Sequence, residues 1–163
     1  ELNLLIDTSS SLAYREMAVI LGEIKKAIES AKIKQLNVFM WAGTPYEYKS
    51  WSDFDGSKFN ILLDWVFKVW TEGGNDEEAL YNEIIKMGKA KKFTISLTDA
   101  YLKDHFREGS SLKKSWTNAL DVSQTIFAII YPSKNINYEQ WLELGKTMPG
   151  RKVPIFFDTS KFD

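Results

Sequence analysis

The sequence predicts an α/β domain of three layers, with helices on both faces of a doubly wound, mostly parallel sheet and one antiparallel strand at the edge. Short apolar runs that fit strands alternate along the whole chain with longer segments of helical periodicity. The first run, residues 2–6, is too short for a helix and suits a strand buried on both faces. Residues 46–51 alternate only weakly, so we expect them to form an edge hairpin with the strand before them.

The first half of the chain begins with the strand over residues 2–6. A helix is expected over residues 12–31, because apolar residues recur there at steps of three and four. A second strand is expected over residues 35–42, and the turn at residues 43–45 ends it. After the edge strand, a loop leads to a helix over about residues 58–71.

The second half continues this alternation. A glycine turn leads into a helix with an acidic first turn, and Gly88 ends that helix after Met87. The remaining strands are expected over residues 93–97, 125–131 and 153–157, and the remaining helices over residues 112–122 and 138–146.

Size and composition limit the possible functions. The chain has 163 residues, a net charge of −1 and no cysteine. The length suits a single domain over residues 1–163. The lack of cysteine excludes disulfides and thiolate metal sites, and the near-zero net charge gives no basic field that would attract nucleic acid. No run reaches the ~18 apolar residues of a membrane span. Since there is no initiating Met and no visible signal peptide, we expect a domain of a longer, cytoplasmic protein.

The first strand ends on a group of oxygen-bearing side chains. Asp7, Ser9 and Ser11 follow the buried run, at the edge of the sheet where open α/β folds bind ligands. One carboxylate and two hydroxyls suit a hard divalent cation such as Mg²⁺ or Mn²⁺. The alternative is that these residues cap the helix that follows, which Asp and Ser do commonly.

Two later loops make the metal interpretation stronger. Residues 73–76 read Gly-Gly-Asn-Asp before a helix, and Thr98-Asp99 ends a buried strand. Together with Asp-x-Ser-x-Ser at residues 7–11, they resemble the von Willebrand factor A family in order and spacing over nearly the whole chain. The resemblance implies a Rossmann-like α/β fold and a metal-ion-dependent adhesion site.

The resemblance carries over to particular residues. Asp7, Ser9 and Ser11 match the first motif, and Asp99 matches the aspartate of a later Thr-Asp-Gly motif, written here as Thr-Asp-Ala. The family's threonine position falls on Asn75, which is a departure because an amide brings NH₂ donors besides its oxygen. Asp76 is the substitute ligand that we expect beside it.

The resemblance implies a non-enzymatic module that binds a protein partner. The cation keeps an open position for a Glu or Asp of the partner, and intracellular members of the family often work with AAA ATPases of the MoxR kind. One alternative is a structural scaffold whose metal site is degenerate. Another is a metal-dependent hydrolase using Asp7 and Asp99, but His105 is the only imidazole and is expected to be a solvated loop residue.

Two further groups of residues have simpler interpretations. We expect Lys86, Lys89, Lys91 and Lys92 to form a solvated face at the end opposite the metal. Three aromatic residues near the predicted sheet edge are the best candidates for an exposed contact patch. They are Tyr46, Tyr48 and Trp51.

Overall fold

In the described part of the chain, six strands form one sheet with the order β3-β2-β1-β4-β5-β6. The computed structural model describes residues 1–8, 14–30, 32–41, 45–70, 77–98, 109–131 and 155–158. The strands are β1 (Leu2–Asp7), β2 (Leu36–Trp41), β3 (Pro45–Trp51), β4 (Phe93–Thr98), β5 (Thr125–Tyr131) and β6 (Ile155–Asp158). All neighbouring pairs are parallel except β2 and β3, which are antiparallel.

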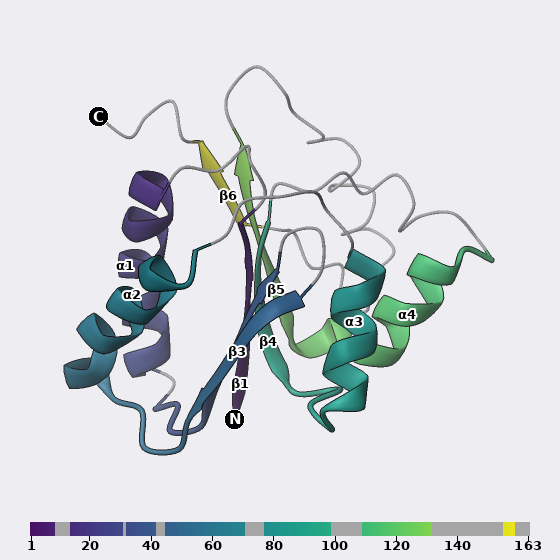
Figure 1. Cartoon of the computed structure of the whole chain (residues 1–163), viewed down its shortest axis with the longest axis horizontal. Helices are drawn as coiled ribbons and strands as arrows, with labels where there is room; N and C mark the ends of the chain where they lie inside the picture. Colours follow the sequence, from purple (N-terminus) through teal and green to yellow (C-terminus); the bar gives the residue numbers. More distant parts are fainter. Residues whose placement is uncertain are drawn as a thin grey trace.

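Helices cover both faces of this sheet. On one face lie α1 (Tyr14–Ser30) and α2 (Phe59–Lys68), and on the other lie α3 (Glu77–Lys86) and α4 (Ser111–Ala119) (Figure 1). The predicted three-layer, doubly wound sheet with one antiparallel edge strand is therefore confirmed.

Strand β1 lies between β2 and β4 in the sheet, and its side chains are apolar on both faces. Leu2, Leu4 and Ile6 pack in the core beneath α1 and α2, whereas Leu5 packs in the core beneath α3 and α4. Successive side chains of a strand point to opposite faces, so a run without alternation is what a strand buried on both sides requires. Burying each of these side chains fully stabilises the fold by about 1.5–3 kcal/mol.

The observed helices differ from the predicted ones mainly at their ends. A 3-10 turn over Gly56–Lys58 precedes α2, and the Asp55 side chain caps it by accepting a hydrogen bond from the Ser57 backbone N–H at 2.8 Å. Helix α4 ends at Ala119, earlier than expected, because Leu120 is extended. The helix expected over residues 138–146 lies outside the described residues.

The described residues include no helix that is both long enough and apolar enough to cross a membrane.

Candidate functional site

The candidate site lies at the carboxyl edge of the sheet, where β1 ends between β2 and β4. The chain winds from β1 through α1 to β2 on one side, whereas β4, β5 and β6 lie on the other side. The junction of β1 and β4 is therefore the switch point of the sheet, which is the position where open α/β sheets form a ligand crevice. Asp7 is the last residue of β1, and Thr98 is the last residue of β4.

Asp7 is fully buried, with 0% of its surface exposed. It lies two residues beyond Leu5 on the same strand, so its side chain is on the sheet face covered by α3 and α4. A buried carboxylate is tolerated only when it is hydrogen-bonded, paired with a cation or bound to a metal. Burial at this edge therefore requires that the Asp7 carboxyl group be satisfied locally, by a hydrogen bond or by a cation.

Thr8 fixes the direction of the chain as it leaves β1. Its backbone N–H donates to the carbonyl oxygen of Trp41 at 2.9 Å, and its hydroxyl donates to the same oxygen at 3.4 Å. The pairing of β1 with β2 therefore continues one residue beyond Asp7, whose Cα partner is Trp41. This continuation holds the backbone next to the carboxylate in place.

Trp41 forms the wall beside Asp7. It is 1% exposed and belongs to the core beneath α3 and α4. Its indole Nε1 is buried, and within the described residues it has no hydrogen-bond partner. A buried N–H without a partner costs about 1–3 kcal/mol.

Most of the predicted metal ligands lie outside the described residues. This holds for Ser9, Ser11, Asn75, Asp76 and Asp99. Among the residues that the structure describes, no cluster of three or more His, Asp or Glu side chains could hold a metal ion. Of the predicted site, the structure therefore places Asp7 alone.

The elements that flank these segments are nevertheless placed. Asp99 directly follows β4 in the sequence, and the turn that carries Asn75 and Asp76 directly precedes α3, which begins at Glu77. Since β1 and β4 are parallel neighbours, with Ile6 opposite Leu97, both strands deliver the chain to the same edge. A Mg²⁺ or Mn²⁺ ion bound there would be held by Asp7 and by oxygen ligands from these segments.

The aromatic patch expected at the sheet edge is not formed by the residues that can be described. Tyr48 is half-buried and its ring lies 4.8 Å from that of Phe39, and Trp51 is half-buried with an edge-on contact of 5.6 Å to Trp65. The prediction of an exposed patch is wrong for these two residues, because both edge aromatics contribute to the packing of the core. The Tyr46 side chain and His105 lie outside the described part of the chain.

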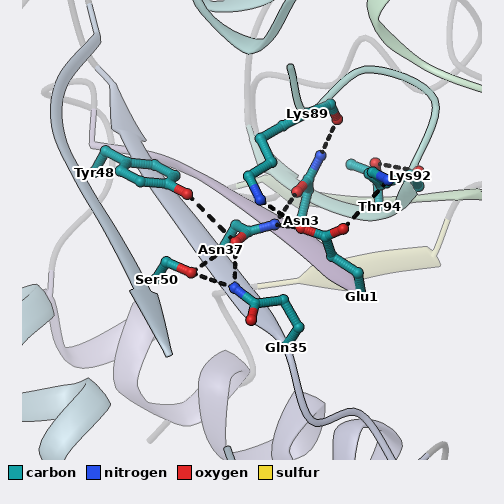
Figure 2. Close-up of polar contacts among 9 residues, drawn as sticks. All are labelled: Glu1, Asn3, Gln35, Asn37, Tyr48, Ser50, Lys89, Lys92 and Thr94. Atoms are coloured by element: carbon teal, nitrogen blue, oxygen red, sulfur yellow. Dashed lines mark hydrogen bonds and ion pairs between the residues drawn. The ribbon is translucent and has the colours of Figure 1, made fainter. Parts of the chain in front are cut away.

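A second polar assembly, which the sequence did not indicate, lies at the opposite, amino edge of the sheet (Figure 2). At its centre, the amide Nδ2 of Asn37 donates to Asn3 Oδ1 at 2.9 Å and to Glu1 Oε2 at 2.7 Å. The Asn3 amide donates in turn to the backbone oxygen of Lys89 at 2.8 Å. We call this assembly the amino-edge cluster; its members are Glu1, Asn3, Gln35, Asn37, Tyr48, Ser50, Lys89, Lys92 and Thr94.

Charge holds the amino-edge cluster together as well. The Lys89 ammonium lies 2.7 Å from Glu1 Oε2, and that of Lys92 lies 3.3 Å from Oε1. The hydrogen bonds from Lys89 and Asn37 lower the pKa of Glu1 to about 2, and Glu1 raises the pKa of Lys89. The expectation of a solvated lysine face is wrong for these two lysines. The described contacts tie β1 to the α3–β4 connection and give the cluster a structural role.

Lys91 is engaged in a different way. Its backbone N–H donates to the Ala119 oxygen at 2.8 Å, and its ammonium donates to the backbone oxygens of Leu120, at 3.0 Å, and Thr117. Its φ of 63° places it in the left-handed region. Lys91 thus satisfies carbonyl groups at the end of α4, where a cation is also favoured by the helix dipole.

No known family model matches the sequence, and no curated protein matches it. The fold is similar to that of proximal thread matrix protein 1 from the mussel byssus, with a TM-score of 0.62 and 13% identity over 96% of this chain and 43% of that one. It is also similar to BatB, a conserved hypothetical protein from Bacteroides thetaiotaomicron, with a TM-score of 0.54 and 14% identity over 98% and 91% of the two chains.

A von Willebrand factor type A protein from Catenulispora acidiphila shows a looser likeness, with a TM-score of 0.48 and 11% identity over 79% of this chain, which is too loose to carry an argument. This chain spans 32% of the length of that protein and 43% of the mussel protein. At these identities the likenesses establish the fold alone. The strand order and the antiparallel edge strand β3 define an α/β domain with a doubly wound, mostly parallel sheet.

Proposed function

We propose that this domain is a non-enzymatic interaction module that binds an acidic side chain of a protein partner through a divalent cation. The observation that carries the proposal is the position of Asp7. It is a fully buried carboxylate at the end of the central strand, directly at the switch point of the sheet. The sequence supplies further oxygen ligands immediately after the strands and before the helix that meet at this edge.

The chemistry of the proposed site suits Mg²⁺ or Mn²⁺. Both ions prefer oxygen ligands, and the candidate set of Asp, Ser and Asn side chains offers oxygen without sulfur or imidazole. A site made from a few protein oxygens leaves a coordination position that a partner's Glu or Asp can occupy. Cooperation with an AAA ATPase of the MoxR kind and a cytoplasmic location belong to this proposal, and they rest on the family resemblance of the sequence motifs.

One observation favours a second candidate function. Asp7 is 0% exposed, and Thr8 continues the β1–β2 pairing beyond it, so the carboxylate also suits a purely structural role at the strand end. In that case the domain is a scaffold whose metal site is degenerate, with Asn75 in place of a hydroxyl ligand.

Isothermal titration of Mg²⁺ and Mn²⁺ into the wild type, Asp7→Asn and Asp64→Asn tests the proposal. Asp64 is an exposed carboxylate on α2, so it controls for non-specific loss of one negative charge. We expect binding that is lost in Asp7→Asn and kept in Asp64→Asn, because an amide attracts a divalent cation far less than a carboxylate does. Circular dichroism spectra that agree between the variants will show that Asp7→Asn is folded.

The outcomes separate the two functions. Metal binding that depends on Asp7, together with metal-dependent capture of a peptide bearing a Glu, supports the interaction module. Absence of metal binding to the folded wild type contradicts it and leaves the scaffold.

A further inference from the structure

The outer edge of β3 has no partner strand within the described part of the chain, because β3 lies at the end of the sheet and pairs there with β2 alone (Figure 1). Such an edge exposes backbone N–H and C=O groups that can pair with a strand of another chain. The hydrogen bonds of β2 determine which residues of β3 point these groups outwards.

The backbone groups of β2 alternate between its two neighbouring strands. The Gln35 oxygen accepts from the Leu2 N–H at 2.9 Å, and at the other end of β2 the Trp41 oxygen also accepts from the chain of β1, again at 2.9 Å. Odd-numbered residues of β2 therefore point their backbone groups towards β1. Even-numbered residues, such as Val38, point theirs towards β3.

This alternation divides β3 into inward and outward residues. Lys49 lies opposite Val38, so its backbone groups face β2, and those of Glu47, two residues away, do the same. Tyr48 and Ser50 alternate with them, so their backbone groups face the free edge. The register with β2 is regular from Glu47 to the end of the strand, which leaves this part of the edge suited to pairing.

The side chains of Glu47 and Lys49 lie on the face of the sheet covered by α1 and α2. The Lys49 ammonium lies 5.2 Å from the centre of the Trp51 ring, which packs edge-on against Trp65 of α2. Tyr48 points to the opposite face (Figure 2). Both charged side chains are exposed, and neither takes part in an ion pair with another described residue. The edge thus presents a carboxylate and an ammonium side by side on one face.

We propose that two copies of this chain associate through β3, paired antiparallel about a twofold axis at Tyr48. In this register Tyr48 lies opposite Tyr48 of the second copy, so the outward backbone groups of the two strands can exchange hydrogen bonds. Glu47 then lies opposite Lys49 of the second copy, on the same face and with Cβ atoms ~5 Å apart. The twofold axis repeats this contact, so two ion pairs form. The dimer does not involve Asp7, so it is independent of the proposed metal site.

Charge selects this register over its neighbours. Outward backbone groups match only when even-numbered residues of the two strands lie opposite one another, which limits the shifts that are possible. Centring the axis on residue 47 places Glu47 opposite its own copy, and centring it on residue 49 does the same for Lys49. Like charges directly opposite are destabilising. Charged edge residues commonly prevent pairing with foreign strands, whereas the order of charges on β3 is complementary to a second β3.

Reversal of these charges tests the proposal in the full chain. Sedimentation equilibrium of the wild type should show a reversible dimer with a dissociation constant on the order of 0.1–1 mM, because the added strand pairing is short. Glu47→Lys alone and Lys49→Glu alone should each dimerise about tenfold more weakly, since both ion pairs become like-charge pairs. An equimolar mixture of the two variants should form a heterodimer with about the wild-type affinity, because opposite charges again face each other.

The matched control reverses charges on α1, where Glu23 and Lys26 are exposed. Glu23→Lys and Lys26→Glu change the net charge by the same amounts, yet they should keep the wild-type affinity and show no preference for each other when mixed. Hydrogen exchange of the Tyr48 amide should slow as the concentration of the wild type rises. A wild type that stays monomeric up to about 1 mM, a mixture of the β3 variants no tighter than its components, or Tyr48 exchange that is independent of concentration would overturn the proposal.

Discussion

Replacing Asn37 with aspartate probes the amino-edge cluster without changing its volume. Asn37 is 0% exposed and joins the strands β1, β2 and β3. Its amide nitrogen donates to Glu1 and Asn3, while its oxygen accepts from Gln35 Nε2 at 3.0 Å and Ser50 Oγ at 2.9 Å. Asn37→Asp keeps the acceptor and turns the donor into a second oxygen, so any change in stability comes from hydrogen bonding and charge.

The magnitude follows from the two lost donor contacts. A hydrogen bond to a charged group such as Glu1 contributes about 1.5–3 kcal/mol, and a neutral one such as that to Asn3 contributes about 1 kcal/mol. Repulsion between the introduced carboxylate and Glu1 adds to this loss. We therefore expect Asn37→Asp to lower the free energy of unfolding at pH 7 by about 3–4 kcal/mol, a large part of the 5–15 kcal/mol of an ordinary domain.

Urea denaturation followed by circular dichroism measures this loss, and its pH dependence identifies the cause. Glu1 and Asn3 Oδ1 raise the pKa of the introduced carboxyl in the folded state, because only its protonated form can donate to them. A raised pKa favours folding below the unfolded value of ~3.9, and this contribution is lost as the pH rises. The destabilisation should therefore be smaller at pH 4 than at pH 7.

Asn82→Asp is the matched control, since Asn82 is exposed on α3. It should change the free energy of unfolding by less than about 0.5 kcal/mol at either pH. A loss below about 1 kcal/mol for Asn37→Asp, or a loss that is equal at pH 4 and pH 7, would refute the reasoning.

Two further predictions concern the same edge of the sheet. The Glu1 pKa of about 2, against an ordinary value of 4.5, stabilises the fold above pH 4.5, and this contribution is lost as the pH falls towards 2. Glu1→Gln should therefore lower the free energy of unfolding at pH 7 by about 1–2 kcal/mol, a value reduced by solvent screening. Between pH 5 and pH 2, the urea midpoint of Glu1→Gln should change less with pH than that of the wild type. Lys91→Ala should lower the free energy of unfolding by about 1–2 kcal/mol. Lys91→Gly should lower it less, because glycine tolerates the φ of 63° at this position. Equal thermal denaturation midpoints for the two variants would exclude a contribution from the backbone conformation.

Much of the fold could be predicted because it is encoded locally. The apolar runs at β1, β2 and β5 fall within one residue of the observed strands. The end of α4 was predicted too late, because apolar residues continue to Val122 whereas the helix ends at Ala119. There Asp121 caps a 3-10 turn by accepting from the Ser123 N–H at 3.0 Å. Apolar periodicity alone does not register such a cap.

The two polar ends of the sheet differ in how far the sequence predicts them. The position of Asp7 follows from a local pattern, a buried strand that ends on a carboxylate, and the structure places it at the expected edge. The pairing of Lys89 with Glu1 joins residues 88 positions apart, so no local pattern indicates it. Asn3 and Asn37 lie singly within apolar runs, and only the parallel register brings them into contact.

The central position of β1 has a consequence for how the chain folds during synthesis. Residues 2–7 leave the ribosome before the rest of this domain, yet they pair with residues 36–41 on one side and 93–97 on the other. Until β4 has emerged, β1 exposes an unpaired apolar edge, and closing the longer loop carries an entropic cost. A nascent chain that ends before residue 93 should therefore stay protease-sensitive and recruit chaperones, and folding should become cooperative only after β4 is free.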